Sequence, residues 1–245
     1  MINLTIGTWN LEDNYSLTGI NEKKVDAIIE LLMDNQIRIL GLQGVSPVLA
    51  QKLDEKLKKI YGYYSITSAY KKRINPIRNL IDKYNLIISD LPYYHSQQFK
   101  LPIYFKSMIG DYSDCSLIQQ SFLIGNDTVR FYNTCLFDND DEMNCRQLNA
   151  LYAYLLKDMI SYQDMNSILF GSFFDKPDSK NMKYFTEILN GVDLDVIENH
   201  NPTFKNEIAD YIVVPNNYIV DSVECIDNYD ENISAHNPVI AKIIK

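Results

Sequence analysis

Histidines, cysteines and clustered aspartates are among the side chains of this 245-residue chain that could bind a metal or transfer protons. They are His95, His200 and His236; Cys115, Cys135, Cys145 and Cys225; and Asp138, Asp140, Asp141, Asp175 and Asp178. The three histidines follow no metal-ligand spacing, and the cysteines contain no CxxC pair, so neither set predicts a zinc site. The aspartates either recruit a cation or are ordinary solvated turns, and the sequence leaves both interpretations open.

The stretch "LFGSFFDKP", residues 169–177, has the form of a catalytic loop. An apolar run ends in a glycine, and an Asp-Lys-Pro turn follows. Between them, where a hydrolase would need a carboxylate and an amide, the chain carries Ser172 and Phe174. This stretch raises the question of whether a hydrolytic site has lost its chemistry.

The charge of the chain opposes nucleic-acid binding, except in one segment. Acidic residues outnumber basic ones by 32 to 23, which gives a net charge of −9 and disfavours non-specific attraction to nucleic acid or anionic membranes. Segment 70–83 is the exception, with Lys71, Lys72, Arg73, Arg78 and Lys83. It is either a solvated loop or a surface that faces phosphate groups.

Strands and helices alternate along the chain without repeats or linkers. The pattern predicts strands at 2–10, 37–43, 84–90, 166–171, 210–215, 218–226 and 238–244, and a hairpin around "GND" at 125–127. It predicts helices over 21–35, from Pro47 to about Ile60, over 142–160 and near 178–190. This order indicates a single α/β domain spanning 1–245 with mixed sheets. No apolar run approaches the length of a membrane span, and no signal peptide is recognisable, so we expect a cytoplasmic protein.

Short segments in the same order along the chain resemble those of the endonuclease/exonuclease/phosphatase family. "TWNL" (8–11) resembles the opening T-W-N, "ILGLQGV" (39–45) resembles L-x-L-Q-E-V, and "FYNTCLFD" (131–138) resembles V-x-N-T-H-L-D. Arg146 and Gln147 fit the R-x-x-Q region. "LFGSFFDKPDS" (169–179), "ADYIVVP" (209–215) and "ISAHNPVIAKI" (233–243) resemble L-x-G-D-F-N-D-x-P-x-S, I-D-Y-I and S-D-H-x-P-V.

The resemblance implies a fold and a chemistry. The fold is a four-layer α/β/β/α sandwich, in which two mixed, mainly antiparallel sheets pack face to face and the site lies at one rim. The chemistry is phosphoester hydrolysis that depends on a divalent cation with oxygen ligands.

At five family positions, however, this chain carries side chains that cannot perform the family's roles. The metal-holding Glu corresponds to Gly44, the Asp and Asn of G-D-F-N to Ser172 and Phe174, the phosphate-binding His to Cys135, and the Asp before the last His to Ala235. Five such changes are too many for engineered inactivation. We interpret the five changes as one linked event. Clustered carboxylates repel one another once no cation lies among them, so replacing them removes a cost in stability.

Three family positions are retained: Asn10, Asp210 and His236. By resemblance, the carboxylate of Asp210 fixes the tautomer of the His236 imidazole, and Asn10 supports the metal site. These residues are either a surviving acid–base group or a buried polar pair that is kept because removing one partner strands the other.

We therefore expect a catalytically inactive member of the family that binds a protein or small-molecule partner in the former cleft and needs no cofactor. The alternative is a phosphoesterase with a rearranged Mg²⁺ or Mn²⁺ site, acting on a nucleic acid or another phosphodiester. Lys71, Lys72, Arg73 and Arg78 favour this alternative, since the segment flanks the cleft in relatives.

Overall fold

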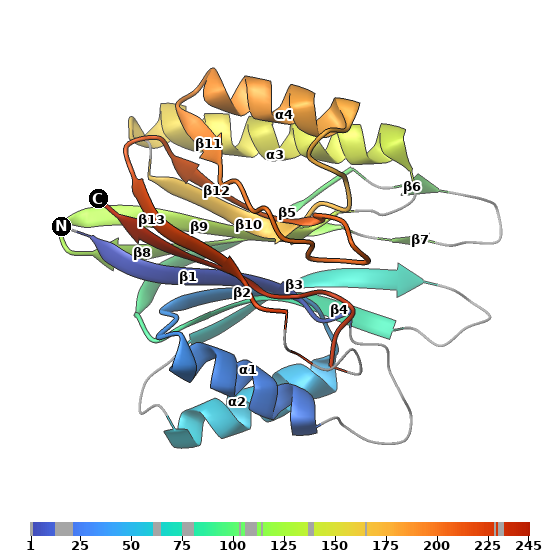
Figure 1. The fold of residues 1–245 in the computed structure, drawn as a ribbon, viewed down its shortest axis with the longest axis vertical. Helices are drawn as coiled ribbons and strands as arrows, with labels where there is room; N and C mark the ends of the chain where they lie inside the picture. Colours follow the sequence, from blue (N-terminus) through green and yellow to red (C-terminus); the bar gives the residue numbers. More distant parts are fainter. Residues whose placement is uncertain are drawn as a thin grey trace.

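The computed structural model describes most of the chain. It covers residues 2–12, 22–60, 65–74, 81–102, 104–105, 112–113, 115–136, 140–164, 166–227, 229 and 233–245. The two ends of the chain lie side by side (Figure 1), because Ile2 and Lys245 exchange two backbone hydrogen bonds of 2.6 and 2.9 Å.

One sheet contains eight strands in the order β13-β14-β1-β2-β4-β3-β7-β6. Their bounds are β1 (Asn3–Asn10), β2 (Ile39–Val45), β3 (Ser65–Ile74), β4 (Ile81–Ser89), β6 (Tyr104–Phe105), β7 (Tyr112–Ser113), β13 (Ile219–Cys225) and β14 (Val239–Ile244). All neighbours are antiparallel except β1 and β2, which are parallel.

The second sheet contains six strands in the order β11-β12-β10-β9-β8-β5. Their bounds are β5 (Tyr93–Lys100), β8 (Ser116–Ile124), β9 (Asp127–Cys135), β10 (Ser167–Ser172), β11 (Leu194–Val196) and β12 (Asp210–Pro215). Here too one central pair, β9 and β10, is parallel and the rest are antiparallel.

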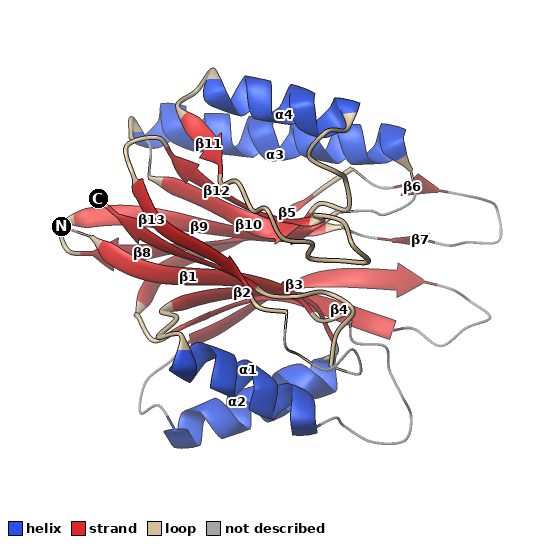
Figure 2. Ribbon diagram, in the orientation of Figure 1, coloured by secondary structure: helices blue, strands red, loops and turns tan. Residues whose placement is uncertain are grey.

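Within the described ranges, four helices cover the outer faces of the two sheets (Figure 2). Helices α1 (Glu22–Asp34) and α2 (Pro47–Ile60) lie on the eight-stranded sheet, and α3 (Asp141–Tyr162) and α4 (Lys180–Asn190) lie on the six-stranded sheet. Three apolar clusters fill the spaces between these layers, including one between the two sheets that contains Ile6, Ile118 and Phe170. The expected four-layer α/β/β/α sandwich is confirmed.

Local chemistry explains where the helices begin. Ser46 Oγ accepts a hydrogen bond from Leu49 N at 3.2 Å, and Pro47 occupies the first turn of α2. Asp140 caps α3 through Met143 N at 2.9 Å, and Ser179 caps α4 through Met182 N at 3.0 Å. The acidic cluster near residue 140 thus includes a helix cap.

The sequence pattern missed several strands. Strand β3 carries the basic segment, and β5, "YYHSQQFK", is mostly polar and partly exposed, so neither shows the apolar alternation of a half-buried strand. Among the described residues, no helix is both long enough and apolar enough to cross a membrane.

Candidate functional site

The retained and replaced family positions meet at one rim of the sandwich, because the strands that carry them end together. Asn10 ends β1, where it is paired with Gln43 of β2. In the other sheet, Ser172 at the end of β10 pairs with Cys135 of β9 and with Asp210 at the start of β12. Parallel neighbours run in the same direction, so their carboxyl ends lie at the same end of the sheet. The pairs β1/β2 and β9/β10 therefore both place their last residues at this rim (Figure 1).

Asp210 and His236 form a buried pair. The Asp210 Oδ2 and His236 Nδ1 atoms lie 2.7 Å apart, and their side chains are 1 % and 0 % exposed. The backbone of His236 is held on both sides: its carbonyl accepts from Trp9 Nε1 at 2.8 Å and its N–H donates to Ser234 Oγ at 2.9 Å. These contacts together hold the imidazole in one position.

Glu12 lies on the other side of the imidazole. Glu12 Oε1 is 3.6 Å from His236 Nε2, and Asn10 Nδ2 is 3.4 Å from the same nitrogen. Burial alone would lower the pKa of His236, but the carboxylates of Asp210 and Glu12 oppose it and raise the pKa to about 9. The hydrogen bond to His236 in turn lowers the pKa of Glu12. The imidazole is thus protonated at neutral pH, which is the wrong state for a general base.

Two phenylalanines cover the imidazole. The Phe204 ring stacks on it at a centroid distance of 4.2 Å and an interplanar angle of 17°, and the Phe174 ring meets it edge to face at 5.5 Å and 87°. Phe174 also contacts Phe204 at 6.1 Å. Together with the pair to Asp210, these rings leave His236 without exposed surface.

Phe174 adopts a backbone conformation that phenylalanine rarely takes, with φ at 52°. Asparagine, the residue expected here by resemblance, tolerates this left-handed region much better than a bulky residue does. Phe173 N and Phe174 N both donate to the carbonyl of Ala209, at 2.8 and 3.3 Å, which holds the loop in place. The loop therefore keeps the shape suited to an asparagine while it presents an aromatic ring.

Gly44 lies close to Asn10 and Glu12, at the end of β1 and in the loop after it. Its φ is +65°, and a Cβ there would lie 2.9 Å from Asn10 Oδ1, 3.1 Å from Glu12 N and 3.2 Å from Glu12 Cα. Asn10 Oδ1 itself accepts a hydrogen bond from Glu12 N at 3.1 Å. A carboxylate-bearing residue at position 44 therefore does not fit this arrangement without movement of the loop after β1.

The other replaced positions, Ser172, Cys135 and Ala235, carry no side chain that is placed to act on a substrate. Ser172 is fully buried, and its Oγ has no hydrogen-bond partner within the described part of the chain. Cys135 is buried, and its Sγ donates to the carbonyl of Leu136 at 3.8 Å. Ala235 is exposed beside His236.

Beneath the rim, two amides join the sheets. Gln43 Nε2 donates to Asn133 Oδ1 at 2.6 Å and to Thr8 Oγ1 at 2.9 Å. Asn133 Nδ2 donates to the backbone carbonyls of Leu42 and Leu86, at 2.9 and 2.7 Å. Gln43 and Asn133 belong to the segments that carry the family resemblance, and their contacts here are structural.

Comparison with solved structures shows the same architecture over the whole chain. The catalytic domain of human Nocturnin is 16 % identical, with a TM-score of 0.78 and coverage of 99 % of this chain and 94 % of that one. An endonuclease/exonuclease/phosphatase protein from Bacteroides vulgatus is 16 % identical (TM-score 0.76, coverage 100 % and 99 %). The mannosyl-6-phosphatase Bt3783 of Bacteroides thetaiotaomicron is 14 % identical (TM-score 0.76, coverage 99 % and 100 %).

This chain has the endonuclease/exonuclease/phosphatase fold. No protein-family model and no curated protein matches the sequence. At these identities, the likeness of this endonuclease/exonuclease/phosphatase-fold protein to the solved structures shows the architecture, and its chemistry has to be argued from its own residues.

The residues present at the rim do not fit a magnesium ion. Mg²⁺ requires near-octahedral oxygen ligands, usually with carboxylates among them. Glu12 supplies a carboxylate that faces an imidazole, and the Asn10 amide oxygen already accepts a hydrogen bond. Nowhere in the described ranges do three His, Cys, Asp or Glu side chains gather as they would around a metal.

The remaining candidates lie apart or outside the described residues. His95 is on β5, and His200 lies in a loop with its Nε2 3.9 Å from Glu198. The backbone of Lys71, Lys72 and Arg73 belongs to β3, whereas their side chains, all of Arg78 and all of Asp138 lie outside the described residues. A phosphate-facing role for the basic segment stays a prediction.

Two site residues, Glu12 and Phe204, were not predicted from the sequence. Glu12 is the first carboxylate after the strand that carries Asn10, which is the one signal that could have suggested it. Phe204 reaches His236 through a short bridge between the segments that contain them. It lies 32 residues away from His236 in the sequence, and no periodic pattern connects the two.

Proposed function

We propose that this protein is a non-catalytic member of the endonuclease/exonuclease/phosphatase fold whose rim binds a partner instead of hydrolysing a phosphoester. The observation that carries the proposal is the enclosure of His236 by Asp210, Phe174 and Phe204, which leaves the imidazole no exposed surface. A general base or phosphate donor has to come within hydrogen-bond distance of the substrate. Here Asp210 occupies Nδ1 of the imidazole, Glu12 and Asn10 lie near Nε2, and the two rings cover the rest of its surroundings.

The donor set supports the same conclusion. Hydrolysis of a phosphoester by the mechanism that the resemblance implies needs a cation, a base for the water and a donor for the phosphoryl oxygen. Gly44, Ser172 and Ala235 offer no carboxylate, and Glu12 is engaged with an imidazole. We therefore expect no bound metal.

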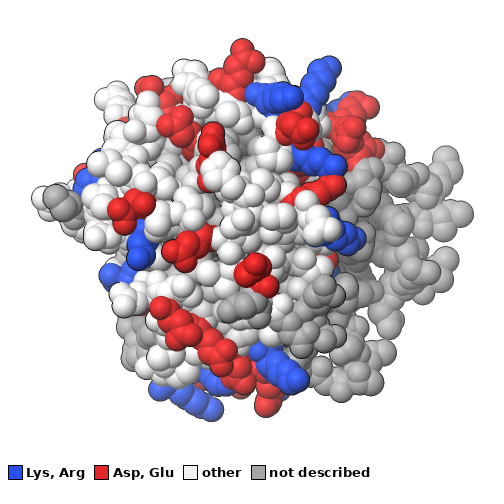
Figure 3. All heavy atoms as spheres, viewed as in Figure 1, with Lys and Arg blue, Asp and Glu red and all other residues white. Residues whose placement is uncertain are grey.

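The rim offers a surface that suits an apolar group. Phe174 and Phe204 are half-buried, and Lys205 Nζ lies 4.5 Å from the centroid of the Phe204 ring. Aromatic side chains beside a cation are frequent anchors in binding sites. On the face in Figure 3, the acidic side chains of the described residues are scattered. The net charge of −9 favours a protein or small-molecule partner over a nucleic acid.

The test is a hydrolysis assay with bis(4-nitrophenyl) phosphate in Mg²⁺, Mn²⁺ or Ca²⁺, together with calorimetric titration of each metal. We expect wild-type protein and a His236→Gln variant to give the same background rate, and we expect no heat of metal binding. Metal-dependent turnover that disappears in His236→Gln would overturn the proposal.

Binding at the rim is tested with a fragment library and NMR spectra of protein labelled at phenylalanine. Fragments that bind should perturb the Phe174 and Phe204 signals, and Phe204→Ala should abolish these effects. If the fragments that bind perturb only signals elsewhere, the rim is not the binding surface.

One observation favours a second function, a phosphoesterase with a rearranged metal site. The Glu12 carboxylate lies 3.6 Å from His236 Nε2, and the Glu12 backbone lies beside Asn10 and beside the place that a Cβ at position 44 would occupy. On this alternative, Glu12→Gln would abolish both metal binding and turnover, whereas on the leading proposal it changes neither.

A further inference from the structure

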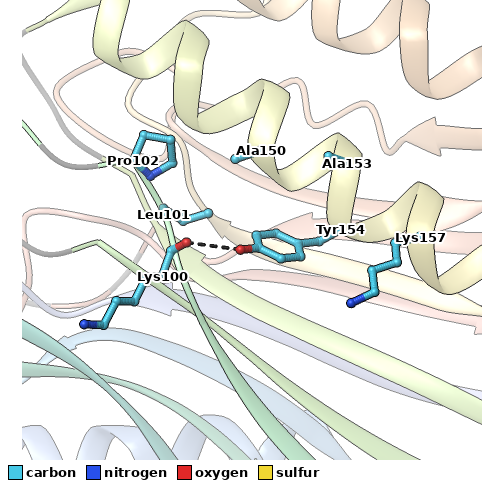
Figure 4. A pocket seen from close by; sticks show the side chains of 7 residues that line it. All are labelled: Lys100, Leu101, Pro102, Ala150, Ala153, Tyr154 and Lys157. Carbon is cyan, nitrogen blue, oxygen red and sulfur yellow. Dashed lines mark hydrogen bonds between the residues drawn. The ribbon is translucent and has the colours of Figure 1, made fainter.

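A groove separate from the rim lies between the end of β5 and α3 (Figure 4). It has a volume of about 600 Å³ and is lined by Lys100, Leu101, Pro102, Ala150, Ala153, Tyr154 and Lys157. None of these residues belongs to the site around His236.

The floor of the groove is apolar because α3 presents small residues there. Ala150, Ala153, Tyr154 and Lys157 follow one another at helical spacing and share one face of α3. The Tyr154 ring packs against Phe99 at a centroid distance of 4.5 Å, and its hydroxyl donates to the Lys100 carbonyl at 3.2 Å. These contacts hold the Tyr154 side chain, which forms one wall of the groove, in place, so the groove is preformed.

The charge of the groove is opposite to that of the protein. Its charged lining residues are Lys100 and Lys157, which lie toward its two ends in Figure 4. Strand β5, "YYHSQQFK", contains no acidic residue, although the chain as a whole carries a net charge of −9. An apolar floor between two lysines is complementary to an apolar side chain flanked by carboxylates.

Strand β5 also has an edge available for pairing. It is the last strand of its sheet and pairs with β8 on one side; among the described residues, no strand pairs with its other side. An open edge of this kind can accept an added strand through backbone hydrogen bonds, while neighbouring pockets select its side chains.

We propose that the outer edge of β5 and this groove dock an extended, acidic and apolar peptide segment of a partner protein. An apolar side chain of the segment would lie over Ala150 and Ala153, and its carboxylates would pair with Lys100 and Lys157.

The test uses two fluorescein-labelled peptides and measures fluorescence anisotropy with the full chain. One peptide alternates Glu with Val and Leu, and the other replaces every Glu with Lys. We expect binding of the Glu peptide alone. The double variant Lys100→Glu/Lys157→Glu should weaken it by about tenfold or more. Ala153→Phe, an exposed helix position whose change fills the groove, should weaken it without unfolding the protein.

A matched control separates local from overall charge. Lys180→Glu/Lys183→Glu changes the net charge by the same amount on α4, where both lysines are exposed. This control should leave the affinity within about twofold of wild type. The proposal fails if neither peptide binds, if the Lys peptide binds equally well, if both double variants act alike, or if Ala153→Phe has no effect. Since no rim residue is altered, the outcome does not depend on whether the rim is catalytic.

Discussion

The imidazole of His236 stacks on the phenyl ring of Phe204, with centroids 4.2 Å apart and planes inclined by 17°. In a hydrolase the same imidazole would have to face substrate. Here one face is covered by Phe204, the edge of Phe174 approaches the ring as well, and carboxylates lie near both of its nitrogens. The arrangement stabilises a buried imidazolium ion, and it determines how the protein should respond to mutation and pH.

Removing the Phe174 ring should open the imidazole to water. In wild-type protein we expect slow exchange of the His236 ring N–H protons, and in Phe174→Ala we expect faster exchange, measured by NMR on ¹⁵N-histidine-labelled protein. The variant should lose about 2 kcal/mol of stability, less than a fully buried phenylalanine because Phe174 is half-buried. Equal exchange rates in both proteins would show that Phe174 does not shield the ring.

Stability should fall as the pH rises from neutral to alkaline. The pKa of His236 is about 9 in the folded protein, because Asp210 and Glu12 outweigh the effect of burial, whereas its ordinary value is 6.5. The protonated imidazole therefore stabilises the fold fully below pH 6.5, and this contribution is lost as the pH rises through 9. Its size is about 3 kcal/mol.

Urea unfolding at about pH 6 and about pH 9.5 measures this loss, with His236→Gln as the reference for all other titrating groups. The stability difference between wild type and His236→Gln should shrink at the higher pH. An NMR titration that places the His236 pKa below 7 would contradict the expectation.

Gly44 and Gly125 form a matched pair for testing the crowding after β1. Both have positive φ, +65° and +64°, but an added Cβ meets Asn10 Oδ1 at 2.9 Å at Gly44 and nothing within 4 Å at Gly125. Gly125→Ala should cost about 1 kcal/mol from backbone strain alone, and Gly44→Ala about 2–3 kcal/mol. Equal losses of stability, measured by chemical denaturation, would mean that the loop carrying Glu12 moves aside at no cost.

Asn133 should be one of the polar residues on which the packing of the two sheets depends. Asn133→Ala would leave the carbonyls of Leu42 and Leu86 without their amide donor and would remove the acceptor of the Gln43 side chain. The expected cost is about 2–4 kcal/mol of stability. Asn149→Ala is the control, because in the described part of the chain this exposed asparagine hydrogen-bonds only within α3, to Cys145. A loss below 1 kcal/mol for Asn133→Ala would indicate that water or repacking replaces these bonds.

Arg130 should be far more important to stability than a surface ion pair. It is 1 % exposed, pairs with Asp164 and Asp158, and lies 4.4 Å from the centroid of the Tyr162 ring. Arg130→Ala should therefore cost about 3–5 kcal/mol of stability, because it leaves buried carboxylate charge without a cationic partner. Arg38→Ala, which breaks the exposed pair with Asp90, should cost less than about 1 kcal/mol. Thermal unfolding of both variants measures the two losses of stability, and equal losses would contradict the prediction.

The sequence by itself determined the architecture. Apolar runs such as Ile39–Val45 and the amphipathic helix at Glu22–Asp34 predict their own structure, because spacing along the chain decides which residues share a face. Motif order placed Asn10, Asp210 and His236 together, and the sequence already showed that Gly44, Ser172 and Ala235 carry no carboxylate.

Only the tertiary structure decided what fills the space that those carboxylates would occupy. Glu12 reaches His236 from the loop after β1, and Phe204 stacks on it from a loop 32 residues upstream. Neither contact follows from spacing, because loops at a rim meet according to how the strands pair and how the two sheets pack. Phe174 shows the same limit: its identity is in the sequence, but the left-handed backbone that points its ring at His236 comes from the hydrogen bonds to Ala209.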